Sequence, residues 1–393
     1  MNTVQSLPVS PEFSIHNKVK LVRGGAAYFL LLKQMIHAAK SSIHLQIYIF
    51  ECDETGVEVG AALMKAAHRG VKIYILLDGY ASQYLSKEFI EQLKESGIYF
   101  RWFEPLFRSK YFYFGRRLHH KLVVTDLQYS LVGGVNISNK YNDMPNEKAW
   151  LDWALYCNGE VSKELYNLCI EFWNKSYWGI RKNKLLKATI SARADANKCL
   201  VRVRRNDWVK RKNQITQSYL EMFKNAESHI LIVSSYFLPG RVFKSNMLHA
   251  VRRGVKIKVI AAGPSDVPIV KHAERYLYRW MLKNKIELYE YQNNILHGKL
   301  STCDAKFVTV GSYNINNISA YASIELNLDV QNNSFAKEVE EIIQTLLKNE
   351  CVRITEKEFE KYNSFAKRIW QKGCYVIYKA GFYLFTFYFK QHN

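Results

Sequence analysis

The sequence predicts an α/β protein built from two similar domains that are related by a pseudo-twofold axis. Three observations support this prediction. The chain has 393 residues, enough for two domains of ~150 residues and a tail. Its composition, with 48% hydrophobic and 23% charged residues, is globular rather than disordered or coiled-coil. The third observation is an internal repeat, and it decides the domain organisation.

The first part of the repeat predicts a βαβ unit in each half of the chain. AKSSIHLQIYIF (39–50) and AAHRGVKIYILLDG (66–79) correspond to AESHILIVSSYF (226–237) and AVRRGVKIKVIAAG (250–263). Each pair predicts a helix end, an apolar strand, a connecting helix and a second apolar strand, which is typical of buried parallel strands. Gly70 and Gly254 of the RGVK turns lie where a helix C-terminus needs a left-handed residue, so we assign them structural roles.

The second part of the repeat gives the domain boundaries. LHHKLVVTDLQYSLVGGVNIS (118–138) corresponds to LHGKLSTCDAKFVTVGSYNIN (296–316), in the same order and at nearly the same spacing. A whole domain is therefore duplicated. We expect an N-terminal extension at 1–19, domains at 20–190 and 191–350, and a basic aromatic tail at 351–393. The charge-rich stretch 181–213 is expected to hold the linker.

Each copy carries the pattern H-x-K-x-x-x-x-D followed by G-[GS]-x-N. The residues are His119, Lys121, Asp126, Gly133, Gly134 and Asn136 in the first copy, and His297, Lys299, Asp304, Gly311, Ser312 and Asn314 in the second. Residues i and i+2 of a strand share a face, so His and Lys point together. If the Asp begins a two-residue hairpin, His119 lies opposite Asn136 and Lys121 opposite Gly134. Each hairpin then presents an imidazole, an ammonium and a carboxamide.

Two such hairpins predict one shared site at the interface of the two domains. Lysine and asparagine can hold phosphate oxygens by charge and hydrogen bonds. One histidine can then attack phosphorus while the other protonates the leaving oxygen. A single H-x-K is most often an ordinary strand, but two copies with the same downstream Asn argue strongly against that interpretation.

These motifs resemble the HKD motifs of the phospholipase D superfamily. The surrounding segments SSIHLQIYIF, RGVKIYILLDG, HHKLVVTD and LVGGVNIS are most similar to the bacterial cardiolipin synthase branch, and the likeness covers roughly residues 18–345. The resemblance implies two phospholipase D-like α/β/α domains, a phosphohistidine intermediate, no metal, and transfer of a phosphatidyl group between alcohols. Exchange of one phosphodiester for another needs no nucleotide or other cofactor.

The resemblance also implies roles for individual residues. His119 would be the nucleophile and His297 the general acid/base, with Lys121, Lys299, Asn136 and Asn314 binding phosphate. Ser312 matches the serine of the family pattern, and Gly134 replaces it in the first copy. The double glycine is common in cardiolipin synthase-like members.

The carboxylates are expected to divide between two roles. Asp126 and Asp304 belong to the motif, but their place in the turn favours a structural role. Another carboxylate should orient each histidine through its far nitrogen. Asp152 follows Asn136 by 16 residues and Asp329 follows Asn314 by 15, and both match the downstream acidic position of the family. Glu325 is a rival to Asp329.

Charge and aromatic content indicate the partners. Lys plus Arg is 56 against 35 for Asp plus Glu, giving +21, so we expect an anionic partner: nucleic acid or a membrane. The tail segment CYVIYKAGFYLFTFYF (374–389) would span ~24 Å as a helix, short of a ~30 Å bilayer core. An interfacial element fits it better, the alternative being an element packed on the body. The stretch FEPLFRSKYFYFGRR (103–117) has the same interfacial composition.

We therefore expect phospholipid substrates, phosphatidylglycerol and also phosphatidylethanolamine, at an anionic membrane surface. Nucleic acid is the less favoured partner, because both motifs lie in one chain and the aromatic tail has no role on a nucleic-acid backbone. A phospholipase D-type hydrolase, an HKD-family nuclease and a membrane scaffold with a dead site are the alternatives. The sequence carries no signal for an oligomeric state.

The chain ends and the cysteines predict a location. MNTVQSLPVSPEF lacks a basic region followed by an apolar core, so no signal peptide is expected. The seven cysteines are odd in number and form no CxxC, which disfavours a disulfide framework or a zinc site. We expect a peripheral or monotopic protein on the cytoplasmic side of the cell membrane.

Overall fold

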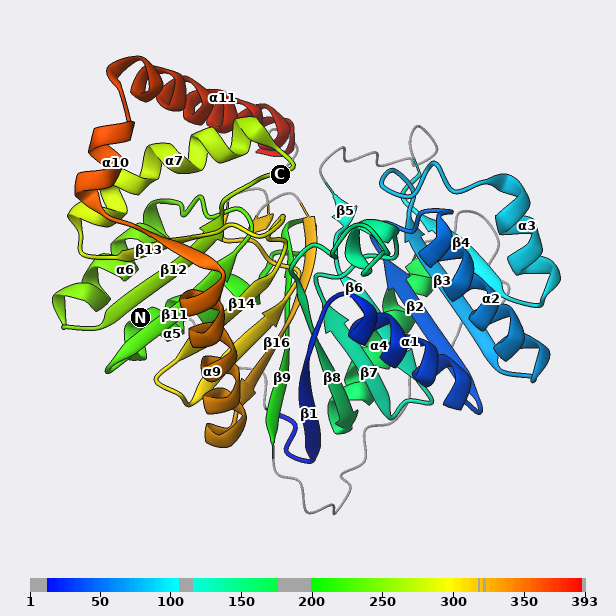
Figure 1. Cartoon of the computed structure of the whole chain (residues 1–393). Coiled ribbons are helices and arrows are strands. Elements are labelled where there is room, and N and C mark those ends of the chain that lie inside the picture. Colours follow the sequence, from blue (N-terminus) through cyan, green and yellow to red (C-terminus); the bar gives the residue numbers. More distant parts are fainter. Residues whose placement is uncertain (1–12, 106–115, 176–198, 317–318, 321–322, 391–393) are drawn as a thin grey trace, which may run out of the picture.

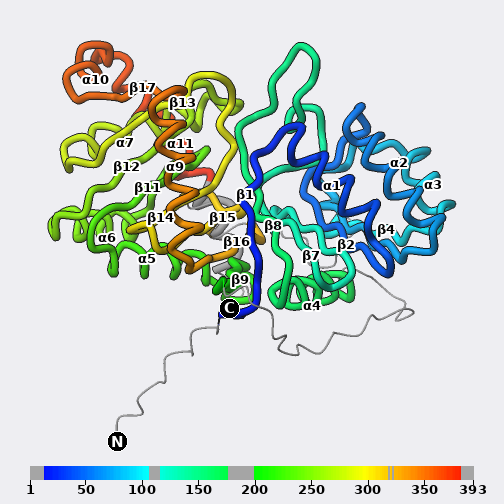
Figure 2. The backbone as a smooth tube through the Cα atoms, turned by 60° about the horizontal axis from the view of Figure 1, so that its bottom comes forward, coloured from blue at the N-terminus to red at the C-terminus, as the bar shows by residue number. Residues whose placement is uncertain are grey.

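The computed structural model describes residues 13–105, 116–175, 199–316, 319–320 and 323–390, with side chains to residue 381. Two α/β halves lie side by side, the first at the right of Figure 1 and the second at the left. Strand β1 runs along their boundary in both views (Figures 1 and 2). The predicted fold class is confirmed, since each half has a central sheet with helices on both faces. Much of the expected linker (181–213) and most of the aromatic stretch 103–117 lie outside the described residues.

The first half is built on a seven-stranded sheet in the order β1-β8-β7-β6-β2-β3-β4. Its strands are β1 (Asn17–Arg23), β2 (Ser42–Ile47), β3 (Lys72–Asp78), β4 (Tyr99–Phe103), β6 (Lys121–Thr125), β7 (Tyr129–Gly133) and β8 (Trp153–Gly159). Its helices are α1 (Ala26–Ala38), α2 (Glu54–His68), α3 (Lys87–Glu95), the short 3-10 turn η1 (Asn139–Tyr141) and α4 (Glu160–Lys175).

The second half repeats this order as β9-β16-β15-β14-β11-β12-β13, with β10 and β17 added at the two edges. Its strands are β9 (Leu200–Asp207), β10 (Lys212–Asn213), β11 (His229–Ser234), β12 (Lys256–Ala262), β13 (Glu287–Tyr291), β14 (Lys299–Cys303), β15 (Phe307–Gly311), β16 (Ser323–Gln331) and β17 (Cys351–Ile354). Its helices are η2 (Trp208–Lys210), α5 (Gln214–Asn225), α6 (Arg241–Arg252), α7 (Pro268–Lys283), α9 (Asn333–Asn349), α10 (Glu356–Tyr362) and α11 (Phe365–Lys390).

The predicted βαβ units are present in both halves. β2 pairs in parallel with β3, and β11 pairs in parallel with β12. Gly70 and Gly254 end the connecting helices with φ of 91° and 94°, a conformation that side chains with a Cβ disfavour. The two copies of the sequence repeat therefore form the same local structure.

The motif hairpins differ from the prediction by one residue. Lys121 lies opposite Gly133, and not Gly134, because three residues connect β6 to β7. Asp126 and Leu127 both have positive φ, and the amide of Gln128 donates to the carbonyl of Thr125, so Gln128 is an extra residue after a tight turn. The second hairpin repeats this geometry, with Cys303 opposite Phe307 and positive φ at Asp304. The assumed two-residue turn was wrong in both copies.

The cores explain why the halves cannot be treated as independent bodies. Helices α1, α2 and α3 cover one face of the first sheet, and α5, α6 and α7 cover the corresponding face of the second. The inner faces of both sheets share one continuous apolar cluster with α4 and α9. Leu122 and Leu155 of the first half belong to this cluster together with Leu300 and Leu326 of the second. Its burial stabilises the contact between the halves.

Two short backbone pairings also join the halves. β5 (Arg117–Leu118), immediately before His119, pairs in parallel with the start of β16. In the same way Leu296, immediately before His297, forms a parallel bridge with Leu151, which precedes β8. Each histidine segment is therefore fixed to a strand of the other half.

The residues after 350 form part of the second half. β17 pairs antiparallel with β13, and α11 packs on α7 at the top of Figure 1 through Cys374 and Tyr378. Within the described part of the chain, no helix combines the length and the apolar character needed to cross a bilayer.

Candidate active site between the two halves

The two motif histidines lie just before the inner strands of the hairpins. His119 lies between β5 and β6, and His297 lies two residues before the start of β14. Their side chains are largely buried, 18% exposed for His119 and 9% for His297. The structure thus brings the two half-sites into one buried place where the halves meet.

Each histidine is paired with a carboxylate from the other half. Nδ1 of His119 lies 2.9 Å from Oε2 of Glu325 in β16. Nδ1 of His297 lies 2.6 Å from Oδ2 of Asp152, which precedes β8. This hydrogen bond at Nδ1 sets the tautomer and turns Nε2 toward the site. The short pairings of β5 with β16 and of Leu296 with Leu151 produce both contacts.

Asp329, expected as an orienting residue, lies elsewhere. Its Oδ2 accepts hydrogen bonds from Arg202 Nε at 3.0 Å and from the Ser218 hydroxyl at 2.6 Å. The structural equivalent of Asp152 is Glu325, because Gly134 donates to the carbonyl of Trp153 and Ser312 donates to that of Leu326. The loop between the Asn and the carboxylate is shorter in the second half, so counting residues from the Asn pointed to the wrong position.

The exchange of glycine for serine between the copies follows from these carboxylates. A Cβ on Gly134 would lie 2.4 Å from Oδ2 of Asp152, so only glycine leaves room for that side chain. In the second half the Ser312 hydroxyl instead donates to Glu325, as does that of Ser323. The departure from the family serine in the first copy therefore has a steric cause.

Lysine and asparagine of each motif are held in matching ways. Lys121 Nζ donates to the carbonyl of His119 at 2.6 Å, and Lys299 Nζ donates to the carbonyl of His297. Oδ1 of Asn136 accepts from the Ile49 amide at 3.1 Å. Oδ1 of Asn314 accepts from the Ser235 hydroxyl at 2.6 Å. The NH2 group of Asn136 also bonds the Tyr141 hydroxyl. An NH2 group has two N–H donors, so both carboxamides can still donate to an anion.

Burial and mutual repulsion shape the electrostatics. Burial and the charge of Lys299 lower the pKa of Lys121 to about 7. Burial and repulsion by both lysines lower the pKa of His297 well below its usual value. Burial also lowers the pKa of His119, although Glu325 opposes this. An anion between the lysines would relieve this repulsion.

The two carboxylates differ in their ionisation. Burial raises the pKa of Asp152 to about 6, against the opposing charge of Lys299. Glu325 is buried as well, but His119 and the hydroxyls of Ser312 and Ser323 hold its pKa below the usual value. Glu325 is thus the more firmly ionised of the two.

The motif aspartates lie at the far ends of the hairpins. Asp126 accepts hydrogen bonds from the amides of Lys40, Ser41 and Ser42 at 2.8–3.0 Å. Asp304 accepts the equivalent bonds from the amides of residues 227–229. The five residues of β6 separate Asp126 from the site by roughly 16 Å. These aspartates fasten the hairpin to the turn before β2 or β11 and do not reach the histidines.

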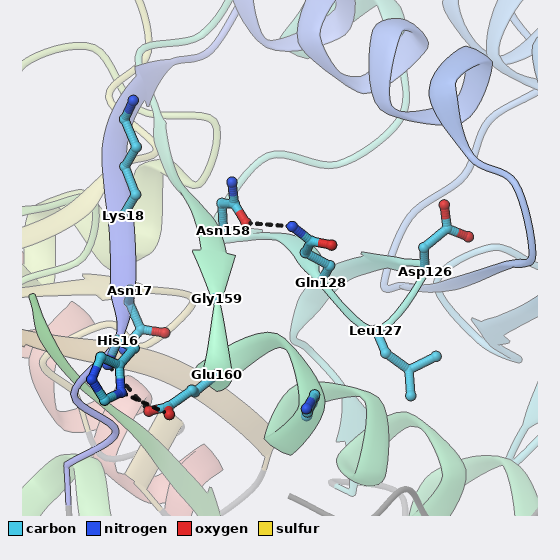
Figure 3. Close-up of a pocket in the computed structure, with 10 residues that line it drawn as sticks. His16, Asn17, Lys18, Asp126, Leu127, Gln128, Asn158, Gly159 and Glu160 are labelled. Atoms are coloured by element: carbon cyan, nitrogen blue, oxygen red, sulfur yellow. Dashed lines mark hydrogen bonds and ion pairs between the residues drawn. The ribbon is translucent and has the colours of Figure 1, made fainter. Parts of the chain in front are cut away.

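A polar pocket at that far end is distinct from the histidine site. Figure 3 shows it lined by His16, Lys18, Asp126 and Glu160, among others. His16 Nδ1 lies 2.9 Å from Oε1 of Glu160, and Gln128 donates to Asn158. Since Asp126 marks the end of β6 remote from His119, this pocket has no part in the chemistry of the histidines.

Two tyrosines join the site without any signal in the motif. The ring of Tyr48 lies 4.7 Å from that of His119 and 5.0 Å from Lys121 Nζ. The hydroxyl of Tyr141 lies 3.4 Å from Nε2 of His297. Tyr48 belongs to the apolar segment 39–50 and directly follows β2, but its position beside His119 depends on the fold. Within the described residues, no group of three or more His, Cys, Asp or Glu side chains could hold a metal ion.

Comparisons with known proteins agree with this geometry. A family model described as "Cardiolipin synthase, PLD-like domain" matches residues 32–168 and 219–347. Cardiolipin synthase B of Shigella flexneri is 32% identical over 348 residues, which cover 86% of this chain and 83% of that protein. Cardiolipin synthase B of Escherichia coli (strain K12) gives the same figures. The chain belongs to the cardiolipin synthase branch of the phospholipase D superfamily.

Solved structures support the fold of this phospholipase D-superfamily enzyme, a phosphatidyltransferase. A crystal structure of phosphatidylserine synthase from Haemophilus influenzae Rd KW20 superposes with a TM-score of 0.71 at 13% identity, covering 93% of this chain and 97% of that one. A polyphosphate kinase from Porphyromonas gingivalis gives 0.59 at 16% identity, over 87% of this chain and 49% of that one. At these identities the likeness concerns the fold alone.

Reciprocal substitutions test the steric reason for Gly134. Gly134→Ser should displace Asp152 from His297 and lower phosphatidyltransferase turnover about 100-fold, since small misplacements of catalytic groups have such effects. Ser312→Gly removes one hydrogen bond to Glu325 and should cost about tenfold or less. Steady-state turnover of both variants provides the comparison. Equal losses would contradict the steric explanation.

Replacing the motif aspartates should affect stability more than turnover. Asp126→Ala or Asp304→Ala removes several charge-assisted hydrogen bonds and should lower the free energy of unfolding by about 1–3 kcal/mol. Chemical denaturation measures this change, and turnover of the folded variant should stay within about threefold of the wild type. A loss of turnover beyond 100-fold at unchanged stability would instead indicate a catalytic role.

Proposed function

We propose that the protein is a cardiolipin synthase that converts two phosphatidylglycerol molecules into cardiolipin and glycerol. The observation that carries this proposal is the pairing of His119 with Glu325 and of His297 with Asp152 across the two halves. It gives one site with two oriented imidazoles and two lysines, which suits a double displacement on one phosphodiester. The relatives named cardiolipin synthase B supply the choice of substrate class.

In this proposal His119 is the nucleophile. Glu325, held ionised by two serine hydroxyls, binds Nδ1 of His119 and makes Nε2 the more nucleophilic nitrogen. His119 is also the more exposed of the two imidazoles. His297, whose Nε2 lies beside the Tyr141 hydroxyl, serves as general acid and base.

The reaction proceeds in two steps. Nε2 of His119 forms a bond to phosphorus of the first phosphatidylglycerol, and the bond from phosphorus to the glycerol oxygen breaks as His297 gives that oxygen its proton. A headgroup hydroxyl of the second phosphatidylglycerol then loses its proton to His297, and its oxygen attacks phosphorus. The bond to His119 breaks, and cardiolipin is released. No electrons are exchanged with another reagent.

Four donors are proposed to stabilise the phosphoryl oxygens. Lys121 and Lys299 supply charge, and the NH2 groups of Asn136 and Asn314 supply oriented hydrogen bonds. The Ser312 hydroxyl, bound to Glu325, and the backbone at Gly134 complete the surroundings. Because both lysines repel a proton on His297, a bound phosphate would offset that repulsion and favour the imidazolium needed in the first step.

A lipid assay tests this function directly. Wild-type protein incubated with phosphatidylglycerol vesicles should yield cardiolipin and glycerol by mass spectrometry. His119→Ala and His297→Ala should each lower the rate by at least about 1000-fold, because both displacement steps need both histidines. His68→Ala, at the exposed C-terminal end of α2, is the matched control and should keep full activity.

Each other outcome has a distinct meaning. Phosphatidic acid as the sole product would make the protein a hydrolase. Consumption of phosphatidylethanolamine together with phosphatidylglycerol would add a second donor or acceptor. Cleavage of DNA or RNA without lipid turnover would exclude the synthase.

We further propose that α11 attaches the protein peripherally to an anionic bilayer. One face of the helix packs on α7 through Cys374 and Tyr378. Phe365, Ile369, Val376 and Ile377 of the same helix are exposed, and so is much of Trp370, whose ring also contacts His272 of α7. Lys367, Lys372 and Lys379 are exposed on the same helix. Aromatic and aliphatic side chains among lysines are typical of helices that lie in the interface of an anionic membrane.

A cytoplasmic setting suits this attachment. All seven cysteines are free thiols, as a reducing compartment maintains them. The net charge of +21 would draw the protein toward the anionic lipids of the inner leaflet.

Substitutions on the exposed face of α11 test the attachment. Ile369→Ser with Ile377→Ser, at 57% and 60% exposure, should weaken binding to phosphatidylglycerol-containing vesicles at least about tenfold, since each removes buried apolar area at the membrane. Co-sedimentation measures the binding. The matched control is Leu30→Ser with Val57→Ser, at 57% and 47% exposure on α1 and α2. Equal binding by all three proteins would reject α11 as the anchor.

A further inference from the structure

The two half-sites are close copies, but one position differs in its chemistry. The amides of Glu51 and Leu238 donate to equivalent carbonyls, those of Ile137 and Ile315, so these segments correspond. Counting back from them, Ile49 in the first half corresponds to Tyr236 in the second. An aliphatic side chain thus stands where its counterpart carries a phenol hydroxyl.

A second difference accompanies the first. Gly79 and Gly263 occupy equivalent positions. The amide of Gly79 donates to the carbonyl of Phe103 at the end of β4, and the amide of Gly263 donates to that of Tyr291 at the end of β13. Three residues further on stand Ser82 and Asp266. Ser82 is buried and bonded to the backbone of residues 48 and 50. Asp266 is exposed, and it accepts a 2.6 Å hydrogen bond from the Tyr236 hydroxyl.

This Tyr236–Asp266 pair lies beside the catalytic groups of the second half. Ser235, the neighbour of Tyr236, donates to the carboxamide of Asn314. The charge of Asp266 reaches His297 and Lys299, where it favours the protonated forms and so raises the pKa that each would otherwise have. The Tyr141 hydroxyl borders Nε2 of His297 from the first half. Both histidines have an orienting carboxylate and an aromatic neighbour, Tyr48 for His119 and Tyr141 for His297. Only the second half adds a phenol–carboxylate pair, because Ile49 and Ser82 stand at the corresponding positions of the first half.

The substrate requires such an asymmetry. A phosphodiester lipid has one arm that carries acyl chains and another that ends in a polar alcohol, and only the second leaves in the first step. A fully symmetric site would accept either arm on either side. A carboxylate bonded to a phenol offers strong acceptors for the hydroxyls of a polyol.

We propose that Tyr236 and Asp266 form the subsite for the glycerol headgroup beside His297. The subsite holds the glycerol that leaves in the first step and then the headgroup of the acceptor in the second. This inference rests on the proposed function, and it deepens it by assigning a side of the site to the alcohol. Because the subsite orients the acceptor hydroxyl toward Nε2 of His297, it also favours the lipid alcohol over water.

The experiment compares Asp266→Asn, Tyr236→Phe and wild-type protein on phosphatidylglycerol vesicles. The ratio of cardiolipin to phosphatidic acid reports how the intermediate divides between lipid alcohol and water. We expect this ratio to fall about tenfold in Asp266→Asn and less in Tyr236→Phe. In the reverse reaction, cardiolipin with free glycerol, the KM for glycerol should rise by a similar factor.

The matched control is Glu147→Gln, which removes one exposed negative charge from the loop between β7 and β8. It should keep the wild-type ratio and KM, and thermal unfolding should be unchanged in all three variants. An unchanged product ratio and glycerol KM in Asp266→Asn would overturn the subsite while the synthase function stands. Equal losses of cardiolipin and phosphatidic acid would also overturn it, because Asp266 would then not influence the choice between lipid alcohol and water.

Two further outcomes distinguish a failure of the subsite from a failure of the proposed function. If the ratio falls only when phosphatidylethanolamine is present, Asp266 recognises an ammonium and not a polyol, which rejects the assignment. If the wild type forms no cardiolipin at all, the proposed function itself fails, and the subsite fails with it.

Discussion

The arrangement of this site depends on one constraint: each histidine receives its carboxylate from the opposite half of the molecule. Backbone pairing enforces this exchange, since β5 lies along β16 and Leu296 lies along Leu151. A shift of either half would separate a histidine from its carboxylate and leave a buried charge unpaired, which is costly. The continuous apolar cluster between the sheets keeps the halves in register. Stability and geometry of the site are therefore secured by the same interface.

Within this symmetric frame the two halves supply different electrostatics. Asp152 packs against a glycine and lies in a setting that raises its pKa to about 6. Glu325 is longer, and it is stabilised by two serine hydroxyls that favour its ionised form. Equivalent positions in the fold have thus acquired distinct proton affinities, as a sequence of unlike chemical steps on one phosphate would require.

Much of the fold and part of the site followed from the sequence, for identifiable reasons. Apolar periodicity and the repeated RGVK turns depend on local rules, so the βαβ units could be predicted. The H-x-K spacing predicted that His and Lys of each copy lie together, since the period of a strand is fixed. In the first copy the ring of Tyr48 contacts both His119 and Lys121. The predicted hairpin register was wrong because the same residues can form a two-residue or a three-residue connection, and the sequence does not distinguish them. The positive φ of Leu127 belongs to the three-residue connection that the structure has. Counting from the Asn found Asp152 but preferred Asp329 to Glu325, because the loop before Glu325 is shorter. Counting could not tell which histidine each carboxylate contacts, because the exchange between halves is a long-range property.

The exchange of carboxylates also bears on the origin of the chain. A single-copy ancestor with this hairpin would have held its histidine beside a carboxylate of a second molecule, so its site would have been complete only in a homodimer. In such a homodimer every substitution appears in both half-sites, because both subunits have the same sequence. With both copies in one chain, that restriction does not apply and each side can vary separately. Equivalent positions of the two halves do carry different residues: Gly134 and Ser312, Asp152 and Glu325, and Ile49 and Tyr236.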